Sequence, residues 1–214
     1  MPIQNKSLGI MAWLLIIASC ELFVLIAMLP TSMLQSTGES EYKMTMAFLG
    51  EEAADNLKAK ADNFYDEVFN KTGIVEESFS AFLPTKASQA GSRGLEKLGS
   101  GMFNYINSRL VTFWTAIYLG VYRIFNLLTW APGFIPIFCA AIYDGLVTRR
   151  IRYLTFATSS AIVYGSSRTM VFALLLGPLL YAIFPMPIPP IIAPMWCGVF
   201  AFSCAAMAAN WPRT

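Results

Sequence analysis

The stretch DGLVTRRIR, residues 144–152, places Arg149, Arg150 and Arg152 directly after a long apolar segment, and Arg168 lies shortly before the next one. Residues 145–168 contain no acid, whereas residues 31–108 carry eleven acids against seven lysines and arginines. Short basic loops of membrane proteins stay on the cytoplasmic side. The basic stretch therefore predicts that residues 144–168 are cytoplasmic and that residues 31–108 lie on the opposite side of the membrane.

The overall composition supports a membrane protein. Of the 214 residues, 56% are hydrophobic and only 13% are charged. A soluble domain has about half apolar and about a quarter charged residues. We therefore expect an all-α membrane protein with about four transmembrane helices, a helical periplasmic loop and both termini in the cytoplasm.

Four apolar segments are candidates for these helices, since about 20 apolar residues cross the hydrocarbon core of a bilayer. They are residues 9–29, 126–143, 169–184 and 191–210. The resulting organisation is an N-terminal anchor (1–30), a periplasmic helical region with a Gly/Ser-rich linker (31–108), an interfacial helix and second span (109–143), a basic cytoplasmic segment (144–168) and a pair of C-terminal transmembrane helices (169–214).

The second span is the hardest to place, because the chain is apolar from residue 104 to residue 143. We expect a helix over residues 104–130 in the outer interface, with Arg123 near the headgroups. We expect this helix to break at Pro132, because proline disrupts helix interiors. The second span itself would cover about residues 126–143.

The polar region is expected to be helical as well. Leu57, Ala61, Phe64, Tyr65 and Val68 recur with the spacing of one helix face. This helix should end at residues 72–73, where glycine can act as a C-cap, and a second short helix should follow over residues 74–83. Because large apolar residues are few here, we expect the region to pack on the membrane surface or on another subunit.

Catalytic and cofactor-binding patterns are not found in the sequence. Histidine, the commonest general base and metal ligand, is absent. We find no nucleophile–base pair, no set of metal ligands and no phosphate-binding glycine loop. We therefore expect no enzyme activity, no metal and no cofactor.

Cysteine 20 raises a separate question. All four cysteines lie in apolar segments, which is typical of small packing residues. The residues 17–20 (IASC) also match a lipoprotein cleavage pattern, but the apolar run resumes after Glu21, whereas a secretory apolar region spans only about 7–15 residues. We favour an uncleaved anchor, with lipidation of Cys20 as the open alternative.

Glu21 is the only acid within an expected span. Acids inside a membrane are costly and are functional hypotheses by default. We favour a polar contact to a partner helix. The alternative is a proton relay or an ion pair with Arg123 or Arg168, in which case the chain would be a small transport or channel protein using Glu21 and Arg123.

The arginines around residue 150 have three interpretations. The favoured one is topology together with contact to anionic membrane lipids, and the second is a binding site for a cytoplasmic protein. The third, contact with nucleic-acid phosphates, has little basis without a basic domain, so we expect no direct nucleic-acid contact.

Small residues repeat every four positions in the last apolar segment, at Cys197, Ala201, Ala205 and Ala209. Such a stripe lets another helix approach closely. We therefore expect it to be a helix-packing surface within a homo-oligomer or hetero-oligomer.

The residues around the arginines also resemble a known family. Asp144, Gly145 and Leu146 precede the arginines, and residues 163–164 (Val-Tyr) and Arg168 follow them. This arrangement is similar to a bacterial family of inner-membrane proteins encoded by integrating conjugative elements and conjugative plasmids, near the gene for the coupling ATPase.

The resemblance implies a process and a location. The chain would be an accessory inner-membrane subunit of a conjugative DNA-transfer apparatus of the type IV secretion kind, with other membrane subunits as partners and the coupling ATPase as a candidate partner. The residues expected to contact a partner or lipid are Asp144, Arg149, Arg150, Arg152 and Arg168.

Overall fold

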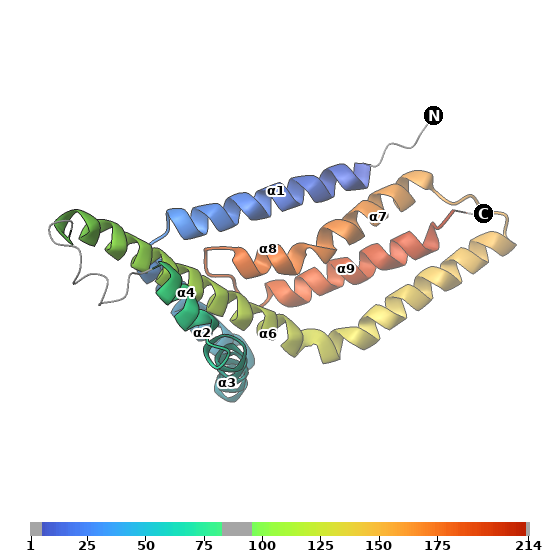
Figure 1. The fold of residues 1–214 in the computed structure, drawn as a ribbon. Helices are drawn as coiled ribbons and strands as arrows, with labels where there is room; N and C mark the ends of the chain where they lie inside the picture. The colour runs from blue at the N-terminus through green and yellow to red at the C-terminus, as the bar shows by residue number, and fades with distance from the viewer. Residues whose placement is uncertain (1–5, 83–95, 213–214) are drawn as a thin grey trace. The chain divides into compact units, whose positions relative to one another are not determined.

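Helices make up all the regular structure that is described. The computed structural model describes residues 6–82 and 96–212 (Figure 1). The elements are α1 (Lys6–Ala27), α2 (Thr31–Leu49), α3 (Glu51–Tyr65), the π-helical turn η1 (Asp66–Asn70), α4 (Ile74–Phe82), α6 (Glu96–Leu154), α7 (Ala161–Leu175), α8 (Gly177–Ile183) and α9 (Ile192–Ala209). The expected all-α fold is confirmed for these residues.

Three helical stretches among the described residues are long and apolar enough to cross a membrane. They are Gly101–Leu154 in α6, Ala161–Ile183 over α7 and α8, and Ile192–Ala209 in α9. Helix α1 contains a shorter apolar stretch, Ala12–Val24. The last two expected spans therefore coincide with helices, and the first remains a prediction.

The break expected at Pro132 is wrong. Pro132 and Pro136 both lie inside α6, which continues for 59 residues. A proline removes one backbone hydrogen bond and distorts the helix locally. Membrane helices tolerate such prolines because neighbouring groups satisfy the freed backbone. The long apolar stretch is therefore one helix and not two.

The chain divides into two compact units, and the first consists of residues 20–125 and 182–188; we call it the acidic unit. Its core joins Leu57 and Ala61 of α3 to Val121 and Tyr122 of α6. A second cluster joins Leu34 of α2 to Leu119 of α6. The polar region thus packs on the first half of α6 of its own chain, and not only on a membrane or another subunit as expected. Residues 117–125 of α6 supply the apolar partners that the region lacks.

Local features of this unit agree with the periodicity. Leu57 and Ala61 are buried, as the helical face predicts, whereas Phe64 is exposed. Gly73 has a positive φ of 76°, a conformation that favours glycine. It separates η1, which ends two residues before the end predicted at 72–73, from α4. The short helix predicted over residues 74–83 is confirmed over Ile74–Phe82, and residue 83 lies outside the described residues.

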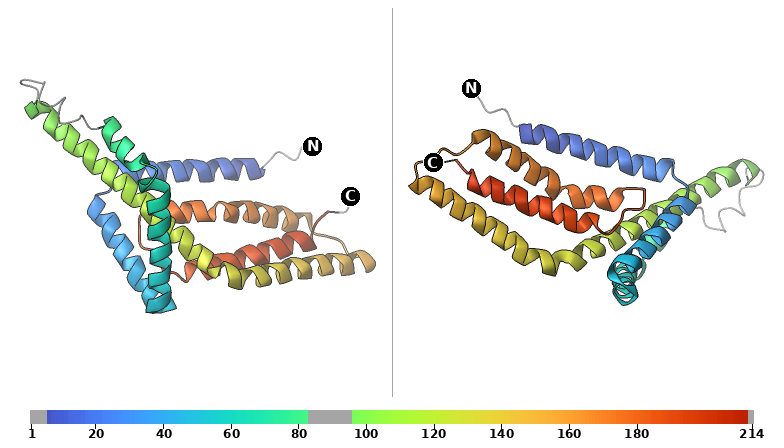
Figure 2. Two further views of the ribbon diagram at one scale, coloured as in Figure 1. Left: turned by 60° about the horizontal axis from the view of Figure 1, so that its bottom comes forward. Right: turned by 180° about the vertical axis from the view of Figure 1, so that it is seen from behind.

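The other unit, here called the basic unit, contains residues 1–19, 126–181 and 189–214. Helix α7 packs against α9, and Figures 1 and 2 show α9 lying beside α7 and the last half of α6. At Gly145 of α6 a Cβ atom would lie 2.5 Å from the Ala205 carbonyl oxygen and 2.9 Å from Ala208 Cβ. Glycine therefore permits the close approach of α6 and α9.

Candidate functional site

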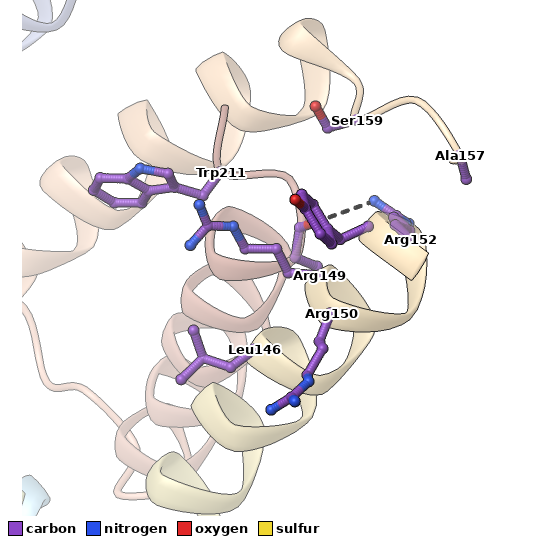
Figure 3. Close-up of a pocket in the computed structure, with 9 residues that line it drawn as sticks. Leu146, Arg149, Arg150, Arg152, Ala157, Ser159 and Trp211 are labelled. Carbon is purple, nitrogen blue, oxygen red and sulfur yellow. Dashed lines mark hydrogen bonds between the residues drawn. The ribbon is translucent and has the colours of Figure 1, made fainter. Parts of the chain in front are cut away.

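A cavity of about 310 Å³ lies at the arginine-rich end of the basic unit (Figure 3). Its walls come from the last turns of α6, the loop that follows, and the end of α9. We call it the basic cavity, and the residues lining it are Leu146, Arg149, Arg150, Arg152, Tyr153, Ala157, Ser159, Ala209 and Trp211.

The loop that lines the cavity begins at the cap that ends α6. Ala157 N donates a hydrogen bond to Arg152 O, and Phe156 N donates one to Tyr153 O. This is the bonding pattern of a Schellman motif, which usually has glycine at the left-handed position. Here Phe156 occupies that position, with φ of 54° and 88% of its surface exposed. The cap turns the chain away from α6 within a few residues.

Asn210 connects the three segments that form the cavity. Its Oδ1 accepts hydrogen bonds from Arg152 Nη1 at 2.6 Å and from Ser160 N at 3.3 Å. Its Nδ2 donates to Ala206 O at 2.9 Å. Asn210 is only 6% exposed, so these bonds are shielded from water. One amide side chain therefore ties the end of α6, the following loop and the end of α9 together.

Two further contacts hold the loop and the C-terminal residues. Ser160 caps α7 by accepting a hydrogen bond from Val163 N, as serine commonly does at an N-cap. The rings of Tyr164 and Trp211 meet edge to face, with centroids 5.6 Å apart. Tyr164 belongs to the Val-Tyr pair of the family resemblance, and the structure gives it a packing role beside the cavity.

The three arginines of the basic cavity differ in how they are held. Arg152 also donates to Ala209 O at 3.3 Å, the bond drawn in Figure 3. Arg149 and Arg150 make no hydrogen bond or ion pair within the described part of the chain. In Figure 3 their guanidinium groups point away from each other. Among the residues that the structure describes, no carboxylate lines the cavity, whereas three arginine side chains do.

The structure thus brings together three of the five arginine-region residues predicted from the sequence. Asp144 is exposed on α6 and does not line the cavity. Arg168 lies on α7, also outside the lining, and its Nε has no hydrogen-bond partner among the described residues. Sequence reasoning missed Ser159 and Asn210. The sequence offered one signal for Asn210, namely a polar residue at the end of the last apolar segment and next to Trp211.

The four small residues of the stripe predicted on α9 differ in their surroundings. Ala201 and Ala209 are buried, and Cys197 is partly buried. Ala205 faces Gly145 of α6, as described above. All four cysteines are free, and Cys20 and Cys139 are exposed rather than buried as expected. A role of the stripe in packing against another subunit stays a prediction.

The acidic unit contains a second polar site, which the sequence did not indicate. Arg123 and Glu41 form an ion pair, with Arg123 Nη2 2.5 Å from Glu41 Oε1, and the side chains are only 1% and 3% exposed. The guanidinium also donates to backbone carbonyls of the segment 182–188, namely those of Ala182, Phe184 and Met186. Ile188 N donates to Glu41 Oε1 at 3.0 Å.

This site corrects the expectation for Arg123. Arg123 is fully buried and bound to Glu41, so the ion pair with Glu21 that the sequence left open does not form. The depth of Arg123 relative to the headgroups stays a prediction. Glu21 Oε2 has no hydrogen-bond partner among the described residues. Eleven acids between residues 31 and 108 were equivalent candidates by sequence, and only the packing of α2 on α6 selects Glu41.

Among the residues that the structure describes, no three histidine, cysteine or acidic side chains gather as they would around a metal ion. The two polar sites therefore offer different chemistry. The Glu41–Arg123 pair is internally neutralised, whereas the described residues supply no acidic side chain to the basic cavity, whose arginines can bind an anion.

Comparison with known proteins adds the family. Residues 13–211 match the family model described as IncC plasmid conjugative DNA transfer protein DtrJ-like. Neither the curated proteins nor the solved structures contain a match. The matched region includes both units and the whole basic cavity. The resemblance to a conjugation-associated family is thereby confirmed.

Proposed function

Since the chain belongs to the DtrJ-like family of conjugative DNA transfer proteins, we propose that it is an accessory inner-membrane subunit of the transfer apparatus. The family match over residues 13–211 is the observation that supports a role in conjugative DNA transfer. The three long apolar helices support the location in a membrane. The chain would hold other membrane components of the apparatus together and perform no chemistry of its own.

The proposed topology has four spans, with α1 as the first. The basic cavity lies in the cytoplasm, because the arginines around it have no acidic neighbours in residues 145–168. Residues 31–108 of the acidic unit then lie in the periplasm. Their exposed acids, which include Glu51, Glu52, Glu76 and Glu77, would meet periplasmic components.

The membrane helices offer surfaces for other subunits. Large apolar side chains stand exposed on α9, with Phe202 75% and Met195 64% exposed. Lipid or a partner helix must cover such side chains. On the cytoplasmic side the candidate partner is the coupling ATPase, which would contact the exposed end of α6 near Asp144.

Deletion of the gene tests the process. We expect the frequency of plasmid transfer from a donor strain to fall strongly and to recover when the full chain is supplied in trans. Unchanged transfer after deletion would refute the proposed role. Cross-linking of the full chain in donor membranes, followed by mass spectrometry, would identify the partner.

Single cysteines test the topology. In a chain without the four native cysteines, Ser40→Cys should react with a membrane-impermeant maleimide in intact spheroplasts. Thr158→Cys should react only after the membrane is opened. Both positions are exposed in the structure, so the opposite labelling pattern would show that the orientation is reversed.

The alternative of a transport path through Glu21 and Arg123 has no support from the contacts. Arg123 is held by Glu41 and by backbone carbonyls of the acidic unit. An arginine neutralised in this way is a structural group and a poor element of an ion path. We therefore make no second proposal.

A further inference from the structure

We propose that the basic cavity binds the phosphodiester of one anionic phospholipid. The proposal rests on the membrane location proposed above, and it adds a ligand site. The occupant is a phosphate group carried by a lipid, recognised by Arg149 and Arg150. Arg152 is a positioning residue, because its guanidinium is bound to Asn210 and Ala209.

Charge is the first argument. Three arginines line a cavity of about 310 Å³, and no carboxylate of residues 6–82 or 96–212 lies in its lining. Guanidinium groups stay protonated and donate paired hydrogen bonds that match phosphate oxygens. Arg149 and Arg150 make no such bonds within the described residues. An anion in the cavity would supply the partner that these two guanidinium groups lack among the described residues.

The walls of the cavity are already fixed without a ligand. The Schellman cap at Phe156, the Ser160 cap of α7 and the three hydrogen bonds of Asn210 hold the loop against α6 and α9. A site ordered in advance loses less conformational entropy when it binds. Ser159 of this loop also lines the cavity.

Apolar surroundings favour a lipid over free phosphate. Leu146, Tyr153 and Trp211 line the same cavity as the arginines. Next to it, Leu154 is 67% exposed and Phe156 is 88% exposed. Acyl chains and glycerol would cover these groups, whereas inorganic phosphate would leave them in water. Aromatic residues at the ends of apolar helices are also typical of the headgroup level.

The volume limits what enters the cavity. About 310 Å³ is at the lower end of the range for small-ligand pockets. It accommodates a headgroup with its glycerol but not the acyl chains. The chains would therefore lie outside, along the exposed apolar side chains. An acidic segment of a partner protein is the competing occupant. A site built for such a segment would show no preference for phosphatidylglycerol over phosphatidylcholine in the experiment below.

The test measures lipid binding to the purified full-length chain in a zwitterionic detergent. Native mass spectrometry counts bound molecules during titration with phosphatidylglycerol, with phosphatidylcholine and with inorganic phosphate. We expect one phosphatidylglycerol to bind more tightly than phosphatidylcholine, which carries no net charge. Equal affinity for the two lipids would overturn the proposal. Phosphate binding as tight as phosphatidylglycerol binding would overturn the lipid assignment.

Variants locate the site. Arg149→Gln and Arg150→Gln should each lower the affinity for phosphatidylglycerol about fivefold, the effect of about 1 kcal/mol per charge near a membrane surface. Lys43→Gln removes one exposed positive charge from α2 and should change the affinity little. If both arginine variants bind as tightly as the native chain, the site is wrong.

Two controls keep the result interpretable. Arg149→Lys keeps the charge and should retain most of the affinity even if Arg149→Gln lowers the yield of folded protein. Because binding is measured on the isolated chain, its outcome is independent of transfer frequency. A native chain that shows no preference for phosphatidylglycerol, together with transfer that depends on the gene, would refute the lipid site only. Preferential binding of phosphatidylglycerol, together with unaffected transfer after gene deletion, would refute the proposed function only.

Discussion

Arg123 and Glu41 are 82 residues apart in sequence and form a buried ion pair, with Arg123 Nε 3.0 Å and 3.1 Å from the two carboxylate oxygens of Glu41. Arg123 is 0% exposed and Glu41 is 3% exposed. Backbone groups of the segment 182–188 complete their hydrogen bonding. The pair therefore fastens α2 and this late segment of the chain to α6.

Removing one member of this pair should strongly destabilise the acidic unit. Arg123→Ala leaves a buried carboxylate without a counter-charge, and such changes cost about 3–5 kcal/mol. We expect the free energy of unfolding of Arg123→Ala to fall by this amount. Denaturant titration followed by tryptophan fluorescence would measure it. Lys71→Ala is the matched control, since Lys71 and Asp66 form a pair at 3.8 Å with exposed side chains, where about 0–1 kcal/mol is at stake. Equal effects of the two changes would contradict the buried pair.

The approach of α6 to α9 predicts a contrast between two glycines of α6. Gly145→Ala places a Cβ 2.5 Å from the Ala205 carbonyl oxygen, and overpacking of this kind costs about 1–3 kcal/mol. Gly133→Ala meets nothing within 4 Å and should be neutral or stabilising by about 1 kcal/mol through helix propensity. Thermal unfolding of both variants in detergent would measure the contrast. A Gly145→Ala variant as stable as Gly133→Ala would show that the helices are not this close.

Asn210 should control the order of the loop beside the basic cavity. Asn210→Ala removes the acceptor for Arg152 Nη1 and Ser160 N, and unsatisfied buried groups cost about 1–3 kcal/mol. We expect faster trypsin cleavage after Arg152, followed by mass spectrometry of the fragments. Thr155→Ala removes only an exposed bond to Ile151 O and should leave the cleavage rate near that of the native chain.

Tyr42 should make stability depend on alkaline pH. Its hydroxyl donates to Asp55 Oδ1 at 2.5 Å, and this hydrogen bond raises the pKa of Tyr42 above its ordinary value of 10.0. Because the folded pKa is raised, the contribution is fully present below the unfolded pKa and is lost as pH rises through the folded pKa. Stability measured between about pH 8 and pH 12 should fall less steeply for Tyr42→Phe than for the native chain. Parallel curves would mean that this bond does not form.

Much of the helical structure could be predicted because it depends on neighbours along the chain. The spacing of Leu57 and Ala61 showed the buried face of α3, and Gly73 marked the end of that helical stretch. Pro132 misled the prediction, since a local rule for breaking helices took no account of the long apolar segment on both sides.

The basic cavity was only half predictable. The arginines stood out because acids are absent around them, but the residues that shape the cavity carry no sequence signal of that strength. Phe156 takes a left-handed conformation that aromatic residues seldom adopt. The conformation accompanies the two backbone hydrogen bonds that end α6, from Ala157 N to Arg152 O and from Phe156 N to Tyr153 O, and the propensity of phenylalanine does not indicate it.

The sequence by itself determined the apolar helices, the separation of acidic from basic segments and the family, because composition and local periodicity record them. Only the tertiary structure decided which polar groups meet. Arg123 forms an ion pair with Glu41, and Arg152 donates a hydrogen bond to Asn210, which lies 58 residues further along the chain. Long-range pairs depend on how helices pack, and many side chains of equal chemistry compete for each partner until the packing is set.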